Sequence, residues 1–214
     1  MTLADITNQF IIDIQTTRWQ EMISTVAQIA SVWYARKNNI LVYPTGIIGV
    51  LLASWVYLFI AHPPLYADGI LNVYYFGMSA YGWYNWIQKT DNQEDTYPIS
   101  WCTKKELQYG IAGFFIGWIV IYMMLQYLTN SNTPFLDSLV SASAVTAMWW
   151  MAKRKTENWI AWIVSNVVAI PLNFYKGFML FTVMYVLFLI LAYMGYQSWK
   201  KESITTAGKS QTRN

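Results

Sequence analysis

Residues 177–199 read GFMLFTVMYVLFLILAYMGYQSW, an apolar run without an acidic or basic side chain. An α-helix needs about 20 apolar residues to cross a hydrocarbon layer roughly 30 Å thick. The rest of the chain fits the same setting, because 56% of its 214 residues are hydrophobic, 18% are aromatic and only 12% are charged. Soluble proteins carry about 25% charged residues. The sequence therefore predicts an all-α protein embedded in a lipid bilayer.

The same composition excludes several classes of function. A single cysteine, Cys102, rules out a disulfide framework, and a single histidine, His62, rules out a multi-histidine metal centre. The net charge of +3 is too small to indicate a nucleic-acid-binding surface, and the chain has no GxxxxGK(S/T) phosphate-binding loop. We therefore expect no cofactor, no metal, no nucleic-acid partner and no ATP hydrolysis.

Seven windows of the sequence predict membrane-spanning helices. Residues 1–17 precede them as an amphipathic lead-in with apolar side chains at helical spacing. Residues 89–107 form a polar loop, and residues 200–214 are expected to be a disordered tail. The expected spans are 18–36, 40–61, 66–88, 108–128, 134–152, 157–174 and 177–199.

The basic residues predict the orientation of these spans. Twelve Lys and Arg side chains fall on one side, and two, Arg18 and Lys176, fall on the other. Because cytoplasmic loops are enriched in Lys and Arg, the N-terminus is expected outside and the C-terminus in the cytoplasm. No basic leader with a cleavage site precedes the first span, which suits a multi-pass protein of a bacterial inner membrane.

Two pairs of short segments predict an internal repeat. WYARK at 33–37 resembles WMAKR at 150–154, and GWYNW at 82–86 resembles GYQSW at 195–199. The first pair closes spans one and five and the second closes spans three and seven, so both halves run in the same direction. The pattern predicts a parallel three-plus-one-plus-three arrangement. Its parts are a first repeat at 18–88, a linker helix at 108–128 and a second repeat at 134–199.

The sixth span places two indoles and an amide on one helix face. Trp159, Trp162 and Asn166 are spaced i, i+3 and i+7. A buried asparagine offers two donors and an acceptor and is costly when they stay unpaired, so contact with a ligand is one interpretation. The alternative is an interfacial aromatic belt for the two tryptophans and a bond from Asn166 to a neighbouring helix.

The third span carries a second aromatic and hydrogen-bonding stripe. Its members recur near helical spacing: Asn72, Tyr75, Ser79, Trp83 and Trp86. These residues are candidates for binding substrate. The alternative is again an interfacial belt for the two tryptophans and close helix packing through the small residues among them.

The fifth span contributes one carboxylate to the candidate site. Thr133-Pro134 predicts a helix start, which puts Asp137 one turn inside the helix, where the helix dipole favours a negative charge. Alternatively, an intramembrane acid marks a substrate or ion path. Together the candidates predict a pocket for a flat heteroaromatic solute, favoured by cation–π attraction of roughly 0.5 to 2 kcal/mol if its ring is positive. No nucleophile and base stand beside them, so we expect no enzyme activity.

Four segments resemble the PnuC family of bacterial vitamin transporters. They are LYAD at 65–68, YGWYNW at 81–86, FLDS at 135–138 and ENWIAW at 157–162 with Asn166 beyond it. The resemblance covers about residues 20 to 200 and implies a SWEET-like fold with seven transmembrane helices, assembled as a homotrimer. It also implies uptake of nicotinamide riboside by facilitated diffusion, trapping by a separate cytosolic kinase, and a substrate site lined by Trp159, Trp162 and Asn166.

One residue departs from this resemblance. Nicotinamide riboside members of the family have Gln in the third span where this chain has Asn72. Similar relatives carry thiamine or other vitamins, so thiamine is the alternative substrate; both molecules present a cationic aromatic ring. A substrate-capture subunit that needs an energising partner, or a membrane sensor, is a more distant alternative.

Overall fold

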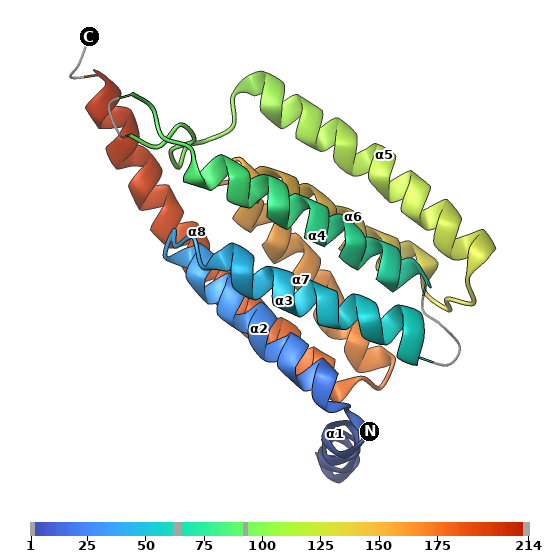
Figure 1. Ribbon diagram of the computed structural model, residues 1–214. Coiled ribbons are helices and arrows are strands. Elements are labelled where there is room, and N and C mark those ends of the chain that lie inside the picture. The colour runs from blue at the N-terminus through green and yellow to red at the C-terminus, as the bar shows by residue number, and fades with distance from the viewer. Residues whose placement is uncertain (1–2, 62–65, 92–93, 212–214) are drawn as a thin grey trace.

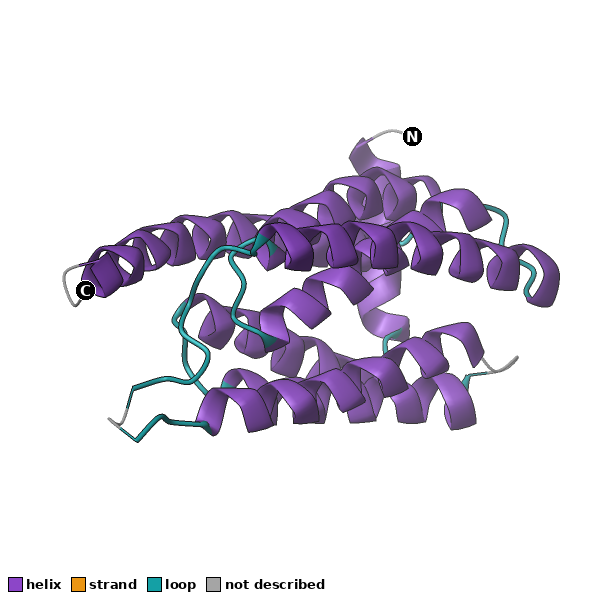
Figure 2. Cartoon of the chain, turned by 90° about the horizontal axis from the view of Figure 1, so that it is seen from above, coloured by secondary structure: helices purple, strands orange, loops and turns teal. Residues whose placement is uncertain are grey.

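The computed structural model describes residues 3–61, 66–91 and 94–211, and within these ranges all regular structure is helical (Figure 2). The predicted all-α class is confirmed. The elements are α1 (Leu3–Thr16), α2 (Trp19–Arg36), α3 (Val42–Trp55) continued by a π-helical turn η1 (Val56–Ile60), α4 (Tyr66–Ile87), α5 (Lys104–Leu128), α6 (Pro134–Ala152), α7 (Asn158–Tyr175) and α8 (Met179–Gln211).

Six helices form two three-helix units, and α1 and α5 lie outside them (Figure 1). In the first unit α3 packs between α2 and α4, and in the second α7 packs between α6 and α8. The units meet where α2 contacts α8 and where α4 contacts α6, while α5 packs mainly against α6. Helix α1 lies at the end where α8 begins.

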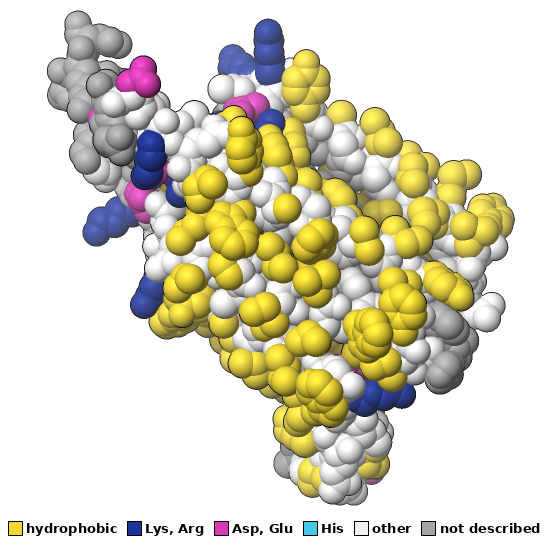
Figure 3. Space-filling view, in the orientation of Figure 1, with side chains coloured by type: hydrophobic (Ala, Val, Ile, Leu, Met, Phe, Trp, Pro, Cys, Tyr) yellow, Lys and Arg dark blue, Asp and Glu magenta, His cyan; other side chains and the backbone are white. Residues whose placement is uncertain are grey.

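Three segments among the described residues have the length and apolarity to cross a membrane: Val42–Ile60, α5 and Met179–Thr205 within α8. The other bundle helices are less apolar because they bury polar and small side chains against their neighbours. In α6 the buried positions include Ser138, Ser143 and Thr146. The surface is rich in hydrophobic side chains along the bundle, and charged side chains gather toward its ends (Figure 3).

Two helix boundaries differ from the sequence-based expectation. Helix α5 begins at Lys104, because Thr103 caps it: the Thr103 hydroxyl accepts from the N–H of Glu106, and the Glu106 carboxylate accepts from the N–H of Thr103. Helix α8 continues from the last expected span to Gln211. The prediction of a disordered tail from residue 200 is therefore wrong as far as Gln211.

The turn after α2 and the turn after α6 have the same backbone structure. Each contains one non-glycine residue with positive φ, Asn38 at 51° and Arg154 at 52°. Each closes with three N–H to carbonyl bonds in the same order: Lys37 to Tyr34, Asn38 to Ala35 and Asn39 to Tyr34 in the first turn, and Lys153 to Trp150, Arg154 to Met151 and Lys155 to Trp150 in the second. When the two turns are aligned by these bonds, Ala35 is equivalent to Met151. This alignment is shifted by one residue from the alignment of WYARK with WMAKR in the sequence.

Two tryptophans join the units through these equivalent carbonyls. The indole N–H of Trp199 in α8 donates to the carbonyl of Ala35 in α2, at 3.0 Å, and that of Trp86 in α4 donates to Met151 in α6, at 3.3 Å. The two indole rings also touch, with centroids 5.9 Å apart. Each unit thus contacts the other through the same type of bond, from an indole N–H in its last helix to a carbonyl near the end of the first helix of the other unit. We call this end of the bundle, where α2, α4 and α6 terminate and α5 begins, the basic end.

A glycine in the last helix of each unit allows a T-shaped aromatic pair beside these bonds. Tyr43 meets the edge of Trp86 with centroids 5.1 Å apart, and Trp159 meets Trp199 at 5.5 Å. The side chain of Tyr43 packs directly on Gly82, and Trp159 packs on Gly195, where an added Cβ would lie 2.6 Å from the indole. Such close approach requires glycine.

We expect Gly195→Ala to destabilise the protein, because the new methyl group would overpack against the fully buried Trp159. Overpacking of this kind costs about 1 to 3 kcal/mol. Thermal unfolding of the purified chain in detergent measures it. Gly117→Ala in α5 is the matched control, because no atom lies within 4 Å of its added Cβ; equal stability of the two variants would contradict the packing described.

Candidate functional site

The helix face of α7 that carries the candidate residues points into the bundle. Trp159 is 0% exposed and Asn166 is 3% exposed. Trp162 is partly buried and packs against an aromatic cluster, the part of the hydrophobic core that contains Trp86, Trp159 and Trp199. Within the described part of the chain, neither indole N–H has an acceptor and the Asn166 amide makes no hydrogen bond. The two indole N–H groups are among eight buried side-chain polar atoms without a partner in the described structure. A buried polar group without a protein partner can be satisfied by water or a ligand.

The stripe on α4 divides into residues of different character. Asn72 is buried, but its side-chain N–H donates to the carbonyl of Asp68 at 2.9 Å, one turn earlier in the same helix. Ser79 is buried beside Gly46 of α3, and Tyr75 packs edge-on against Tyr74. Trp83 is 38% exposed.

Trp86 shares the aromatic cluster with Trp159 and Trp162, so the structure brings these three candidates together from α4 and α7. Its indole N–H, however, is already used by the carbonyl of Met151. Trp86 therefore joins the two units, while the N–H groups of Trp159 and Trp162 have no acceptor in the described structure.

Asp137 lies at the opposite end of the bundle, near the start of α6. Its carboxylate accepts the hydroxyls of Ser131 at 2.7 Å and Thr133 at 3.1 Å, and it forms an ion pair with Lys176 at 2.6 Å. These contacts tie the start of α6 to the end of α7. The carboxylate is thus paired within the protein.

A polar connection between α4 and α5 fastens the basic end. Arg154, in the turn after α6, is buried and stacks 4.4 Å from the centre of the Trp86 ring. Its guanidinium pairs with Asp95 at 3.0 Å and donates to the carbonyl of Tyr97 at 3.0 Å. We call these contacts the Arg154 clasp. In the sequence, Arg154 stood out only as one member of a basic triplet that marks orientation.

The clasp continues to the start of α7. Backbone bonds join Ser100 to the turn on both sides, with its N–H donating to Arg154 and its carbonyl accepting from Thr156. The N–H of Cys102 donates to the Glu157 carboxylate at 2.9 Å, and burial with that carboxylate raises the pKa of the Cys102 thiol. Glu157, the first residue of the ENWIAW segment, thus binds the connection between α4 and α5 through the backbone N–H of Cys102.

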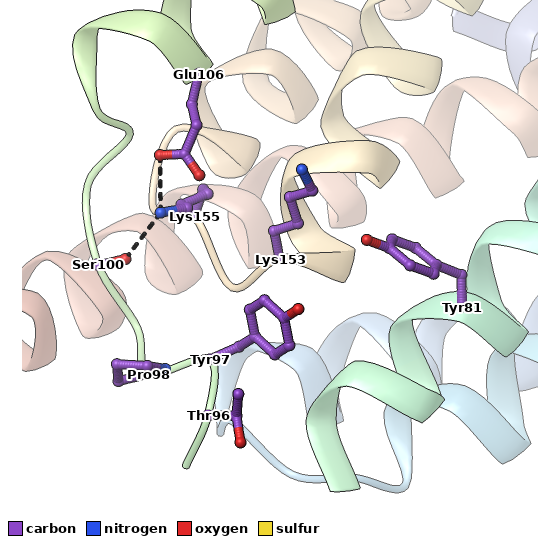
Figure 4. A pocket seen from close by; sticks show the side chains of 8 residues that line it. All are labelled: Tyr81, Thr96, Tyr97, Pro98, Ser100, Glu106, Lys153 and Lys155. Carbon is purple, nitrogen blue, oxygen red and sulfur yellow. Dashed lines mark hydrogen bonds and ion pairs between the residues drawn. The ribbon is translucent and has the colours of Figure 1, made fainter. Parts of the chain in front are cut away.

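Two cavities lie away from the nine predicted residues. One, of about 250 Å³, opens at the basic end and is lined by Tyr81 and Lys153 among others (Figure 4). The other, of about 210 Å³, lies between α4, α5 and α6 beside Tyr74, Tyr109 and Trp149. Whether the α4 and α7 residues bind substrate therefore remains a prediction.

An all-helical bundle of this length, with helices apolar enough to cross a membrane, has the architecture of a multi-pass membrane protein. The sequence profile of the nicotinamide mononucleotide transporter family matches residues 18–201, and the chain belongs to this family. It is therefore a transporter and not an enzyme, and the resemblance to the PnuC family is confirmed.

Relatives with named substrates are distant in sequence but similar in length. The nicotinamide riboside transporter PnuC of Escherichia coli is 24% identical over 205 residues, covering 85% of this chain and 84% of the relative. The riboflavin/roseoflavin transporter RibM of Streptomyces davaonensis is 23% identical over 192 residues, covering 89% and 88%. A crystal structure of the vitamin B3 transporter PnuC, 24% identical, superposes with a TM-score of 0.70 over 95% of this chain and 90% of that one.

We expect the clasp to weaken in acid. Although burial alone would raise it, the pKa of Asp95 is held below its usual value by the hydrogen bond from Lys89 and by the Arg154 guanidinium. A lowered carboxylate pKa contributes stability above the unfolded value of about 3.9 that is lost as pH falls through the folded value. Thermal unfolding measured between neutral pH and pH 3 should show this loss.

Asp95→Asn should remove most of that acid dependence and lower stability at pH 7 by about 1 to 3 kcal/mol, because a buried guanidinium loses its partner. Asp91→Asn is the control, since Asp91 is exposed in the same connection. An unchanged pH profile in Asp95→Asn would show that Asp95 does not stabilise the basic end.

Proposed function

We propose that the protein takes up nicotinamide riboside across the bacterial inner membrane by facilitated diffusion, with a separate cytosolic kinase trapping the product. The observation that carries the proposal is one face of α7, where the indole N–H groups of Trp159 and Trp162 are buried without an acceptor and the Asn166 amide makes no hydrogen bond in the described structure. The indole faces suit a cationic pyridinium ring, and the amide can pair with a carboxamide or a ribose hydroxyl.

We further propose that the bundle spans the membrane as seven helices in a parallel three-plus-one-plus-three repeat. Helices α2, α3 with η1, and α4 form the first repeat, α5 is the linker, and α6, α7 and α8 form the second. The matching turns and the reciprocal indole bonds support this arrangement. The basic end then faces the cytoplasm and α1 faces outside, and the protomers assemble as a homotrimer.

Transport requires the two units to separate at one end and then at the other. At the basic end the indole bonds of Trp86 and Trp199 and the Arg154 clasp join the units. Release of substrate to the cytoplasm would break these contacts. The Asp137 carboxylate forms an ion pair with Lys176, which favours a structural role for Asp137 over a role as a proton carrier.

A different vitamin is the second candidate. Thiamine was the alternative from the sequence, where Asn72 departs from the glutamine of nicotinamide riboside members. Riboflavin is favoured by a specific observation, the similarity to RibM along most of both chains. All three substrates present a flat heteroaromatic ring to the same aromatic and amide groups.

The first experiment is binding of the purified chain to nicotinamide riboside, thiamine and riboflavin in parallel, followed by uptake into sealed proteoliposomes. We expect nicotinamide riboside to bind most tightly and to equilibrate without an ion gradient. Preferred binding of another vitamin would reassign the substrate. Binding without equilibration would instead indicate a capture subunit or sensor.

Asn166→Ala and Trp162→Ala should each weaken binding about 10- to 100-fold, as expected for loss of a hydrogen bond or cation–π contact worth about 1.5 to 3 kcal/mol. Val167→Ala, on the exposed side of the same helix, is the matched control. If both site variants bind and transport like the unmodified protein while remaining folded, the substrate lies elsewhere.

A further inference from the structure

The cavity at the basic end is built from parts of the chain that are distant in sequence (Figure 4). Tyr81 comes from α4, Tyr97 and Ser100 from the connection to α5, and Lys153 and Lys155 from the turn after α6. Its volume of about 250 Å³ is more than a phosphate group needs. The cavity is separate from the face of α7 and from the indole bonds between the units.

The charges that line the cavity do not cancel. Lys155 forms an ion pair with Glu106 at 3.0 Å, and the Glu106 carboxylate also accepts from the N–H of Thr103 at 2.8 Å. Lys153 has no ion pair within the described residues, and its ammonium lies 4.6 Å from the centre of the Trp149 ring. One cation is thus in excess.

Hydroxyl donors stand beside this cation. Figure 4 shows the Tyr81 hydroxyl directed toward Lys153 across the cavity, with the Tyr97 ring on its other wall. In the part of the chain that the structure describes, neither tyrosine hydroxyl makes a hydrogen bond. An ammonium and two hydroxyls from three different elements match the several acceptor oxygens of a phosphate group, which lysine binds as a point charge.

We propose that this cavity binds a phosphate group, carried by a soluble phosphate ester or by the headgroup of an anionic lipid. Lys153 supplies the charge, and the hydroxyls of Tyr81 and Tyr97 donate to the phosphate oxygens. Because Lys153 belongs to the second unit and Tyr81 to the first, a bound phosphate bridges the units. It therefore favours the form closed at the basic end and, resting on the proposed function, slows transport.

The test measures binding of inorganic phosphate to the detergent-purified full chain. Binding is monitored by thermophoresis at constant ionic strength, with chloride as the balancing anion. Phosphate should bind, and Lys153→Gln should weaken it at least about tenfold, since a charge-assisted hydrogen bond is lost. Lys104→Gln is the matched control, an exposed lysine at the same end that does not line the cavity. Tyr81→Phe should weaken binding severalfold.

A second arm separates the two sources of phosphate. The protein is reconstituted with phosphatidylglycerol or with phosphatidylcholine, and the lipid retained after delipidation is measured for the unmodified chain, Lys153→Gln and Lys104→Gln. Retention of phosphatidylglycerol that is lost only in Lys153→Gln, without binding of free phosphate, assigns the site to lipid. If neither probe depends on Lys153, the proposal is overturned. Both readouts measure binding alone, so they stand whichever vitamin is transported.

Discussion

The pairing of indole N–H groups with backbone carbonyls across the two units is the interaction on which this structure depends. The carbonyls of Ala35 and Met151 each accept one bond from the N–H of the following turn, from Asn38 and Arg154, and a carbonyl oxygen has a second lone pair. Trp199 and Trp86 donate to that second position from the opposite unit. A buried indole N–H is costly when it stays unpaired, so these two donors are satisfied only when the units come together, beside the close packing on Gly82 and Gly195.

The tryptophans of the bundle have two roles, which differ in whether the indole N–H is hydrogen-bonded. Trp86 and Trp199 donate their N–H groups to backbone carbonyls, whereas those of Trp159 and Trp162 are unpaired in the described structure. The first pair determines how the units meet. The second pair, together with Asn166, is proposed to contact the solute. This difference separates the residues that hold the transporter together from those proposed to select its cargo.

Composition and motif spacing predicted the class of protein because membrane insertion constrains almost every residue of the chain. They also placed Trp159, Trp162 and Asn166 on one face, since helical periodicity is strict. They failed where three-dimensional contacts decide. The alignment of the repeats was one residue out, because WYARK and WMAKR match best by side chain whereas the turns match by backbone bonds. The role of Arg154 depends on a connection that returns to it from another part of the sequence, and local sequence carries no signal of that.

The extension of α8 has a mechanical consequence. With 33 residues at 1.5 Å per residue, the helix is about 50 Å long, and it projects past the bundle at the end where the units are fastened (Figure 1). Asn38, in the turn of the opposite unit, reaches this projection through a hydrogen bond to Glu202 at 3.2 Å. A rigid tilt of ten degrees about the outer end of α8 would carry its tip roughly 9 Å. A rigid rocking of the second unit would therefore move the projecting end of α8 further than the part of the helix packed within the bundle.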